Sequence, residues 1–371
     1  MGYDWRDQTR KDVLHFTMVS PNNIDQSFGE LQGVELSGSS LTAGYFTDTR
    51  TSGKLRVVNS NWVRGSLIRV THEVPAWGFR RELGTYIVTA DPAERDCGEW
   101  VTDLTLNSRL YGLSTEKHPY PWTIAAGASC LAAMDDSLRC SRAPFIIRDA
   151  NDIRFGAAKV VESGTARLAA LFDLGNASGN RLDVDSHGRV TLSRRMDPGA
   201  KVPLFRIDLN DPRGVMTGGL SLETDWLGMA DAVAVSHKYS ERVGSSSEQR
   251  EIAALATMGD HVHHSHAQRG YRVTNYISLS DMEPKTYERA MQFANDELQK
   301  EQRELIEWQL STTYLPLWEG DAVELYVHDG PYQYRGLRRC FVKSLDLELE
   351  HMTMRMTLKE VASGDKGDEG K

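Results

Sequence analysis

The chain has 371 residues, a formal net charge of -9, 40% hydrophobic residues and 26% charged residues. This length exceeds what one hydrophobic core usually serves, and the composition is that of a soluble protein, so we expect several folded domains. The negative charge excludes electrostatic attraction to a nucleic-acid backbone. No apolar run is long enough to cross a bilayer, and residues 1–10 lack the apolar core of a signal peptide. We therefore expect neither a membrane anchor nor a signal peptide.

The cysteines are scattered along the chain at Cys97, Cys130, Cys140 and Cys340. None of them forms a C-x-x-C pair, which argues against a zinc ribbon or a disulfide framework. We expect reduced thiols in a protein that is made in a cytoplasm.

Residues 1–110 contain strand patterns and no helical pattern. Residues 1–30 are polar with one strand-like run, Val13–Val19, and fit an arm that packs on a neighbour. Residues 31–110 show short apolar runs separated by turn residues, and this spacing predicts a small antiparallel β-barrel or sandwich. The expected strands are Gly33–Leu36, Leu55–Val58, Leu67–Thr71, Gly84–Thr89 and Trp100–Leu106.

Residues 111–198 predict a compact α+β domain. One short helix is expected over Ile124–Leu138, and a second begins at the N-cap candidate Ser163 and stops at Gly175. A β-hairpin then pairs Arg181–Val184 with Arg189–Leu192 across the turn residues 185–188.

Residues 199–279 predict a linker and the first strands of a second β-barrel. The strand expected here is Val233–Tyr239, with a further strand-like run over Tyr271–Ile277, whereas the charged, Ser-rich stretch Ser240–Arg250 predicts an exposed loop.

An inserted helix is predicted over residues 280–312. Ser280-Asp281-Met282-Glu283 is a capping box, and Pro284 suits a first helical turn. Apolar residues then recur at helical spacing up to Leu310, namely Tyr287, Met291, Ala294, Leu298, Leu305, Trp308 and Leu310.

Residues 313–361 predict the closing strands of the second barrel, including Val323–Val327, which Asp329-Gly330-Pro331 ends. The apolar phase of the last two strands, within Leu345–Met356, slips once at Glu350-His351, which predicts a two-residue hairpin loop with Leu349 facing Met352. Because Glu350-His351 is poor chemistry for such a loop, a bulge or a longer loop stays open. The composition of residues 362–371 predicts a disordered tail.

The fold class predicted is therefore α+β, mostly β. It consists of two related small antiparallel β-barrels, an intermediate α+β domain and a long helix inserted before the final β-hairpins. Two β-rich regions of similar size also raise the possibility of an internal duplication.

The main candidate for a metal site is the histidine cluster His261, His263, His264 and His266. Histidines one residue apart on an extended segment face the same way and could bind a metal jointly. We favour the simpler interpretation, an exposed polar loop between Gly259 and Gly270. The chain has no Walker A loop, no H-E-x-x-H and no G-x-S-x-G elbow. We predict no catalytic residue and no cofactor.

Three stretches resemble the tail hub, or baseplate hub, family of tailed bacteriophages, which includes the N-terminal portion of siphophage tail-tip proteins. Leu315-Pro316-Leu317-Trp318-Glu319-Gly320-Asp321-Ala322-Val323 resembles the Pro-x-x-x-Gly-Asp-x-Val turn at which the second hub barrel resumes after its helix. Residues 162–190 resemble the helix and hairpin of the intermediate domain, and residues 111–127 resemble the passage that leaves the first barrel. The sequence lacks the appended lysin or fibre domain of some members, and the histidine cluster is not part of the family pattern.

The resemblance implies a non-enzymatic homotrimer in which two barrels per subunit make a pseudo-sixfold ring. Such a ring joins the sixfold tail tube and distal tail protein to the tail tip, and its channel passes the tape measure protein and then DNA. Its further partner is a tail-tip fibre or receptor-binding protein, and its location is the distal end of the virion tail. Two alternatives stay open: a tail-tip enzyme or binding module that acts on carbohydrate or peptidoglycan, and an adaptor of a non-viral injection apparatus.

Overall fold

The computed structural model describes residues 4–5, 7, 10–141, 143–211, 214–224, 229–243, 246–259, 265–279, 286–303, 306–328 and 335–361. These residues are mostly β with a smaller share of helix, so the predicted α+β, mostly β class is confirmed. They divide into two compact units, one drawn from Met1–Leu220, Leu310–Leu337 and Phe341–Thr357 and the other from the rest of the chain. No helix among the described residues is long and apolar enough to span a membrane.

The first β region contains every strand that the sequence predicts for it. Hydrogen bonds order its main strands β3-β4-β8-β6-β5-β1-β2, and β7 pairs with β8. The expected arm is part of this sheet, because β1 pairs with β5 of the same chain and places Phe16 opposite Val70. The strands are β1 (Val13–Val19), β2 (Ser27–Glu30), β3 (Val34–Gly44), β4 (Thr51–Val58), β5 (Leu67–Val74), β6 (Phe79–Ala90), β7 (Ala93–Asp96) and β8 (Glu99–Asn107).

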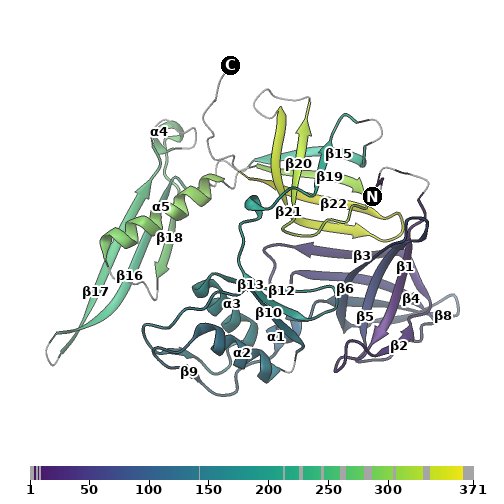
Figure 1. Ribbon diagram of the computed structural model, residues 1–371, viewed down its shortest axis with the longest axis horizontal. Coiled ribbons are helices and arrows are strands. Elements are labelled where there is room, and N and C mark those ends of the chain that lie inside the picture. Colours follow the sequence, from purple (N-terminus) through teal and green to yellow (C-terminus); the bar gives the residue numbers. More distant parts are fainter. Residues whose placement is uncertain are drawn as a thin grey trace. The chain divides into compact units, whose positions relative to one another are not determined.

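The second β region joins the first through one strand pair. Residues 344–348 of β21 pair antiparallel with residues 40–44 of β3, so that Leu347 lies opposite Leu41. The strands of this region are β14 (Phe205–Asp208), β15 (Met216–Thr224), β19 (Ile306–Thr313), β20 (Ala322–Val327), β21 (Gly336–Glu348) and β22 (Thr353–Glu360). Together the described strands of both regions form a 14-stranded sheet (Figure 1).

The predicted closure of two barrels is therefore wrong for the described strands. Their hydrogen bonds run from β15 at one end of the sheet to β2 at the other, and no described sheet closes on itself. The physical reason is the pairing of β21 with β3, because a strand edge that is paired with the other β region cannot close its own sheet.

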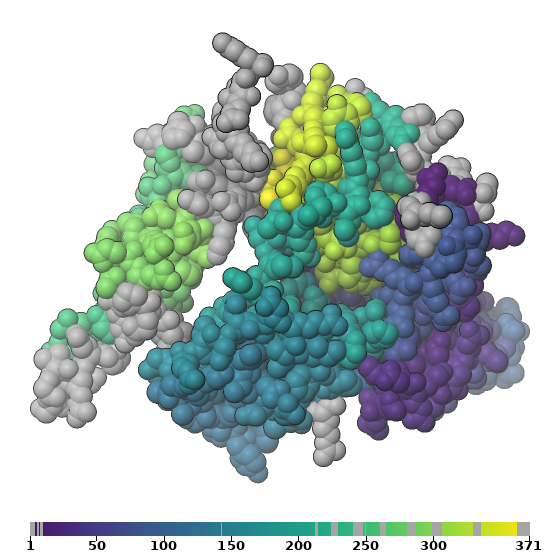
Figure 2. All heavy atoms as spheres, viewed as in Figure 1, coloured from purple at the N-terminus to yellow at the C-terminus, as the bar shows by residue number. Residues whose placement is uncertain are grey.

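An α+β unit lies between the two β regions in sequence. Its sheet has the order β10-β13-β12, and α2 and α3 contribute Met134, Leu138, Leu171 and Leu174 to a shared core with Leu182 and Leu192. Its elements are α1 (Leu110–Thr115), β9 (Trp122–Ile124), α2 (Cys130–Ser141), β10 (Phe145–Arg148), β11 (Lys159–Val161), α3 (Arg167–Ser178), β12 (Asn180–Val184) and β13 (Val190–Arg194). In the space-filling view this unit, in blue-teal, packs against the purple and blue first β region (Figure 2).

The helix boundaries of this unit differ from the prediction: α2 ends at Ser141 and not at Leu138, and α3 begins at Arg167 with Ala166, not Ser163, as its N-cap residue. Ile124 belongs to β9, and α2 begins only at Cys130. Helix α3 continues past Gly175 to Ser178 and ends at Gly179, which has φ 67°. Gly175 is not a stop signal but a site of close packing, because a Cβ there would lie 3.3 Å from the Leu182 side chain.

The second unit contains a three-stranded sheet covered by one helix. Strand β16 (Ala232–Val243) pairs with β17 (Ser246–Thr257) from Ala232↔Thr257 to Val243↔Ser246 and with β18 (Thr274–Leu279) on its other edge. The loop predicted over Ser240–Arg250 is therefore mostly strand. Figure 1 shows α5 (Tyr287–Arg303) lying along this hairpin, and α4 (His266–Arg269) lies between β17 and β18 in the chain. Helix α5 buries Ala290, Ala294 and Leu298 against Val233, Val235, Ala254 and Ala256.

The predicted inserted helix is too long at its C-terminal end. Helix α5 ends at Arg303, and Trp308 and Leu310 lie on β19. The side chains of Trp308, Leu310 and Thr312 are buried at every second position, which is the period of a strand and not of a helix. The capping box at 280–283, Pro284, Leu305, the turn Asp329-Gly330-Pro331 and residues 362–371 lie outside the described residues.

The final hairpin has the predicted apolar face but a longer turn. Leu345, Leu347 and Leu349 are buried on one strand, and Met352, Met354 and Met356 are buried on the other. Strand β21 ends at Glu348 and β22 begins at Thr353, so the turn spans residues 349–352 instead of two residues. Met352 adopts φ 48°, a left-handed conformation that a longer turn accommodates.

Candidate functional site: a buried polar junction

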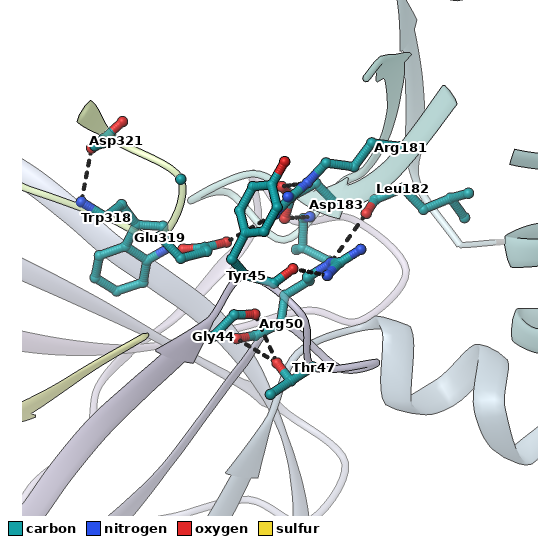
Figure 3. A network of polar contacts seen from close by, with 12 residues as sticks. Gly44, Tyr45, Thr47, Arg50, Arg181, Leu182, Asp183, Trp318, Glu319 and Asp321 are labelled. Atoms are coloured by element: carbon teal, nitrogen blue, oxygen red, sulfur yellow. Dashed lines mark hydrogen bonds and ion pairs between the residues drawn. The ribbon is translucent and has the colours of Figure 1, made fainter. Parts of the chain in front are cut away.

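Charged side chains from three distant segments meet in the first unit at what we call the polar junction, defined as Tyr45, Arg50, Arg181, Asp183 and Glu319 (Figure 3). Tyr45 and Arg50 belong to the turn between β3 and β4, and Arg181 and Asp183 belong to β12. Glu319 lies in the turn that leads into β20. The polar junction therefore connects the first β region, the α+β unit and the second β region.

Hydrogen bonds and backbone conformation within two turns, the one after β3 and the one before β20, position the polar-junction residues of the two β regions. In the turn after β3, the Thr47 hydroxyl donates to Gly44 O at 2.8 Å and Arg50 adopts φ 60°. In the turn before β20, Trp318 N donates to the Asp321 carboxylate at 2.8 Å, and Gly320 adopts φ 77°. A side chain at Gly320 would collide with the Tyr45 ring, so glycine is required both by backbone conformation and by close approach.

Arg181 makes contacts with all three segments. Its guanidinium lies 3.7 Å from the centre of the Tyr45 ring, its Nε is 3.1 Å from Asp183 Oδ2, and its Nη2 is 3.9 Å from Glu319 Oε1. The planar guanidinium suits this position because it can stack on an aromatic ring while its edge donates to carboxylates.

Arg50 ties the β3–β4 turn to β12 through backbone oxygens. Its Nη1 donates to Tyr45 O, and its Nε donates to Leu182 O at 3.4 Å. Its guanidinium also lies 5.6 Å from the centre of the Phe172 ring on α3. Burial, together with the nearby charge of Arg181, lowers the pKa of Arg50 from its ordinary value.

Glu319 is the most deeply buried carboxylate of the polar junction. The residue is 8% exposed, and its Oε2 has no hydrogen-bond partner. Burial, with the charge of Asp183 as a further cause, raises the pKa of Glu319 to about 8, against the opposing effect of Arg181 and Arg50. The side chain is therefore largely protonated at neutral pH.

A cavity of about 510 Å³ adjoins the polar junction. Its walls come from β6, from the turn between β12 and β13, and from the turn before β20, and they include Glu82, Asp183, His187, Trp318 and Glu319. Across it, Thr85 Oγ1 donates to Ser186 O at 2.9 Å, and His187 Nδ1 lies 2.9 Å from Glu82 Oε2. These contacts hold the α+β unit to β6 as well as to the two turns.

A second contact between the β regions involves the N-terminal segment. The Trp5 ring packs edge-on against Trp77, Phe79 and Tyr314 at centroid distances of 5.2, 4.9 and 5.7 Å. Beside it, His72 Nε2 lies 2.7 Å from Asp12 Oδ1, and Arg10 Nε lies 3.0 Å from Asp12 Oδ2. Since Tyr314 belongs to the second β region, Trp5 bridges the two.

Most of the predicted histidine cluster lies outside the described residues. His261, His263 and His264 lie outside them, and His266 is the exposed first residue of α4. Within the described part, the group of potential ligands whose atoms lie within 4.8 Å of one another is Glu348, Glu350 and His351 at the surface. Whether the histidine cluster is an exposed polar loop, as we predict, or a metal site is not tested by the described residues.

Sequence reasoning did not single out the charges of the polar junction. Arg181 and Asp183 fall within residues 162–190 and Glu319 falls within residues 315–323, which are two of the stretches that carry the family resemblance. The location of these residues in the resembling stretches was the only feature of the sequence that pointed to them. It could not identify a contact between the two stretches, because they are more than 100 residues apart in sequence.

Comparisons with known proteins show which solved structures have a similar fold. No protein-family model matches the sequence, and no curated protein matches it. Among solved structures, the chain is similar to a tail protein from Neisseria meningitidis MC58, with a TM-score of 0.66, 11% identity and coverage of 94% of this chain and 96% of that one. The 43 kDa tail protein of prophage MuSo2 from Shewanella oneidensis gives a TM-score of 0.64, 12% identity and coverage of 94% and 98%.

A third similar structure is the prophage tail protein gp18 from Listeria monocytogenes EGD-e, with a TM-score of 0.57, 12% identity and coverage of 93% of this chain and 94% of that one. At these identities the likeness concerns the fold. The chain has the fold of phage tail proteins, in agreement with the family that its sequence motifs resemble.

Proposed function

We propose that the chain is a structural hub at the distal end of a phage tail, where three copies form a ring between the tail tube and the tail tip. The observation that carries this proposal is the extent of the structural likeness, which spans nearly the whole of this chain and nearly the whole of each tail protein. A likeness of this extent leaves little of the described fold for an additional catalytic domain.

The joining of the two β regions supports the ring. A single chain carries two β-rich regions, β1–β8 and the group β14, β15 and β19–β22, and the β3–β21 pair joins them in one sheet. Three copies then offer six such regions, the number that a sixfold tail tube and its distal tail protein require. The repeated subunit interface of a cyclic trimer is heterologous and closes after three contacts.

The electrostatic balance supports passage through the ring. The net charge of -9 gives the lumen of such a ring no general attraction for DNA. The tape measure protein and then the genome pass through without being held. A tail-tip fibre or receptor-binding protein occupies the outer side of the ring.

The test has two parts. Native mass spectrometry and sedimentation of the purified 41.6 kDa chain measure the oligomeric state, and a trimer is the expected result. Electron microscopy of the trimer is expected to give a threefold ring with an axial opening. A monomer at micromolar concentration, or a trimer without an axial opening, contradicts the hub.

The same preparation separates the hub from an enzyme. A tail-tip enzyme that acts on peptidoglycan produces a cleared zone on cell-wall agar, whereas the hub leaves the agar unchanged. Immunogold labelling of virions with an antibody against the chain then tests the location, and the expected position is the distal end of the tail. Labelling of cell envelopes in the absence of virions supports an adaptor of a non-viral injection apparatus instead.

A further inference from the structure

The position of Glu319 favours the protonated form of its carboxyl over the ionised form. Its side chain is only 2% exposed, its Oε1 is 3.9 Å from Arg181 Nη2, and its Oε2 has no hydrogen-bond partner. An ionised carboxylate loses its hydration when it is buried, and a contact of 3.9 Å is too long for a strong charge-assisted hydrogen bond. A protonated carboxyl also loses hydration on burial, but the cost is smaller because no charge is buried.

Charged and titratable groups from the β3–β4 turn and from β12 lie closest to Glu319. The β3–β4 turn contributes Tyr45 and Arg50, and β12 contributes Arg181 and Asp183. Arg181 already forms an ion pair with Asp183 at 3.1 Å, so the charge of Arg181 is balanced without an ionised Glu319. Burial and the repulsion from Asp183 both raise the pKa of Glu319, and together they outweigh the attraction of the two arginines.

Other titratable groups also surround Glu319, among them Lys201, which donates to Gly320 O at 2.7 Å, and Arg81, Glu82 and His187 of the cavity wall. Tyr86 on β6 is completely buried, and burial together with the charge of Glu319 raises the pKa of its hydroxyl. Asp321, in the same turn as Glu319, accepts a hydrogen bond from Trp318 N, and burial raises its pKa. None of these groups supplies a hydrogen bond to the unpartnered oxygen of Glu319.

Water has a route to the polar junction through the adjoining cavity, whose walls include both Glu319 and Asp183. Water that enters the polar junction from this cavity would hydrate an ionised Glu319 and so stabilise it. Hydration of Glu319 would loosen its contact with Arg181, the residue that joins the turn before β20 to β12 and to the β3–β4 turn.

We propose that Glu319 is a proton-operated switch: the α+β unit stays docked on the two β regions while Glu319 carries a proton, and the docking weakens when the proton leaves. The switch acts within a single chain and does not depend on the hub role.

The sign of the pH dependence of docking follows from the difference in the pKa of Glu319 between the docked and the undocked state. In the docked state the pKa of Glu319 is about 8, and in a hydrated, undocked state it returns toward its ordinary value of 4.5. Between these two values the docked state binds the extra proton, so docking is tightest below pH 4.5 and weakens as the pH rises from there to about 8. The population of the undocked state rises by up to about tenfold per pH unit in this window and levels off above it.

Hydrogen exchange of the full chain, followed by mass spectrometry from pH 5 to 9 and corrected for the intrinsic exchange rate, tests this switch. Peptides covering residues 44–50, 181–184 and 318–321 are expected to lose protection together as the pH rises, while a peptide covering β1 keeps its protection. The variant Glu319→Gln stays neutral at every pH, and its three peptides are expected to show no pH dependence.

The matched control is Asp185→Asn. Asp185 lines the same cavity but is paired with Arg189 at 2.7 Å, so this variant is expected to keep the wild-type pH dependence. Unchanged pH dependence in Glu319→Gln, or its loss in Asp185→Asn, overturns the proposal.

A measurement on the wild-type chain covers the case in which Glu319→Gln does not fold. With carboxyl-¹³C glutamate, one glutamate resonance is expected to titrate near pH 8, and its midpoint is expected to coincide with the end of the protection loss. If every glutamate resonance titrates below pH 6, Glu319 is not the switch.

Discussion

The guanidinium of Arg181 lies 3.7 Å from the centre of the Tyr45 ring, and this stacking joins β12 of the α+β unit to the turn that follows β3. The two residues are 136 positions apart in sequence. A cation that is both stacked and paired, as Arg181 is with Asp183, holds a domain contact in one geometry because each partner restricts a different direction of movement.

Replacing this arginine by lysine is expected to weaken the docking of the α+β unit. Arg181→Lys keeps the charge but loses the planar stack and the fork that reaches Asp183, and we expect the free energy of unfolding to fall by about 1–3 kcal/mol in urea denaturation. Tyr45→Leu removes the ring, and a double-mutant cycle is expected to give a coupling of about 1 kcal/mol.

The control for Arg181→Lys is Arg56→Lys at the surface pair with Glu35, where both side chains are more than 40% exposed. A change within about 0.5 kcal/mol is expected there. Equal effects of the two substitutions would contradict a special role for the stack.

Gly320→Ala is expected to destabilise the turn before β20. The added Cβ meets a left-handed φ of 77° and lies 2.7 Å from the Tyr45 ring, so we expect a loss of about 2–4 kcal/mol in the free energy of unfolding. Gly127→Ala is the matched control, because φ is 78° and nothing lies within 4 Å of its Cβ. Its expected cost is about 1 kcal/mol, and the difference between the two variants, measured by thermal unfolding, isolates the collision with Tyr45.

Trp5→Ala is expected to detach the N-terminal segment and weaken the contact between the two β regions. Trp5 is 7% exposed and touches Trp77, Phe79 and Tyr314, so its loss is expected to cost about 3–5 kcal/mol. Trp100→Ala serves as the control, since Trp100 is 57% exposed and its loss is expected to cost under about 1 kcal/mol. Limited proteolysis of residues 1–12 gives the local readout, and an unchanged cleavage rate in Trp5→Ala would exclude the bridging role.

Asp12 is expected to make stability depend on pH in the acid range. Burial alone raises the pKa of Asp12, but its hydrogen bonds with His72 and Arg10 outweigh burial and leave the pKa below 3.8. The unfolded chain therefore binds this proton more readily, so the stabilisation is complete above about pH 4 and is lost as the pH falls through the folded-state pKa.

The corresponding substitution is Asp12→Asn. It is expected to lower the free energy of unfolding by about 1–3 kcal/mol at pH 7 and by less at pH 3, because pH 3 lies below the ordinary pKa of 3.8 and the unfolded wild-type chain then binds the proton at Asp12. Denaturant unfolding at the two pH values measures the difference, with the exposed Asp25→Asn as control. A deficit of the same size at both pH values would show that packing, not charge, accounts for the effect.

Much of the fold could be predicted from local pattern. The sequence alternation predicts β1, β3–β6 and β8 of the first β region, β20, the hairpin of β12 with β13 and the apolar face of the last hairpin, but it does not predict β2 or β7. The boundaries that failed, such as the end of α5 and the start of α2, are places where a neighbouring strand or a side-chain hydrogen bond decides between two local states of similar energy. Asp152, for example, accepts a hydrogen bond from Leu131 N in the first turn of α2.

By itself, the sequence determined the class of the fold, the order of its parts and the family whose motifs it resembles, because apolar periodicity and turn residues act over a few positions. Only the tertiary structure decided that β21 pairs with β3 in place of two closed barrels, and that Arg181, Tyr45 and Glu319 meet. These contacts join residues more than 100 positions apart, and their energies depend on burial and distance, which no local pattern encodes.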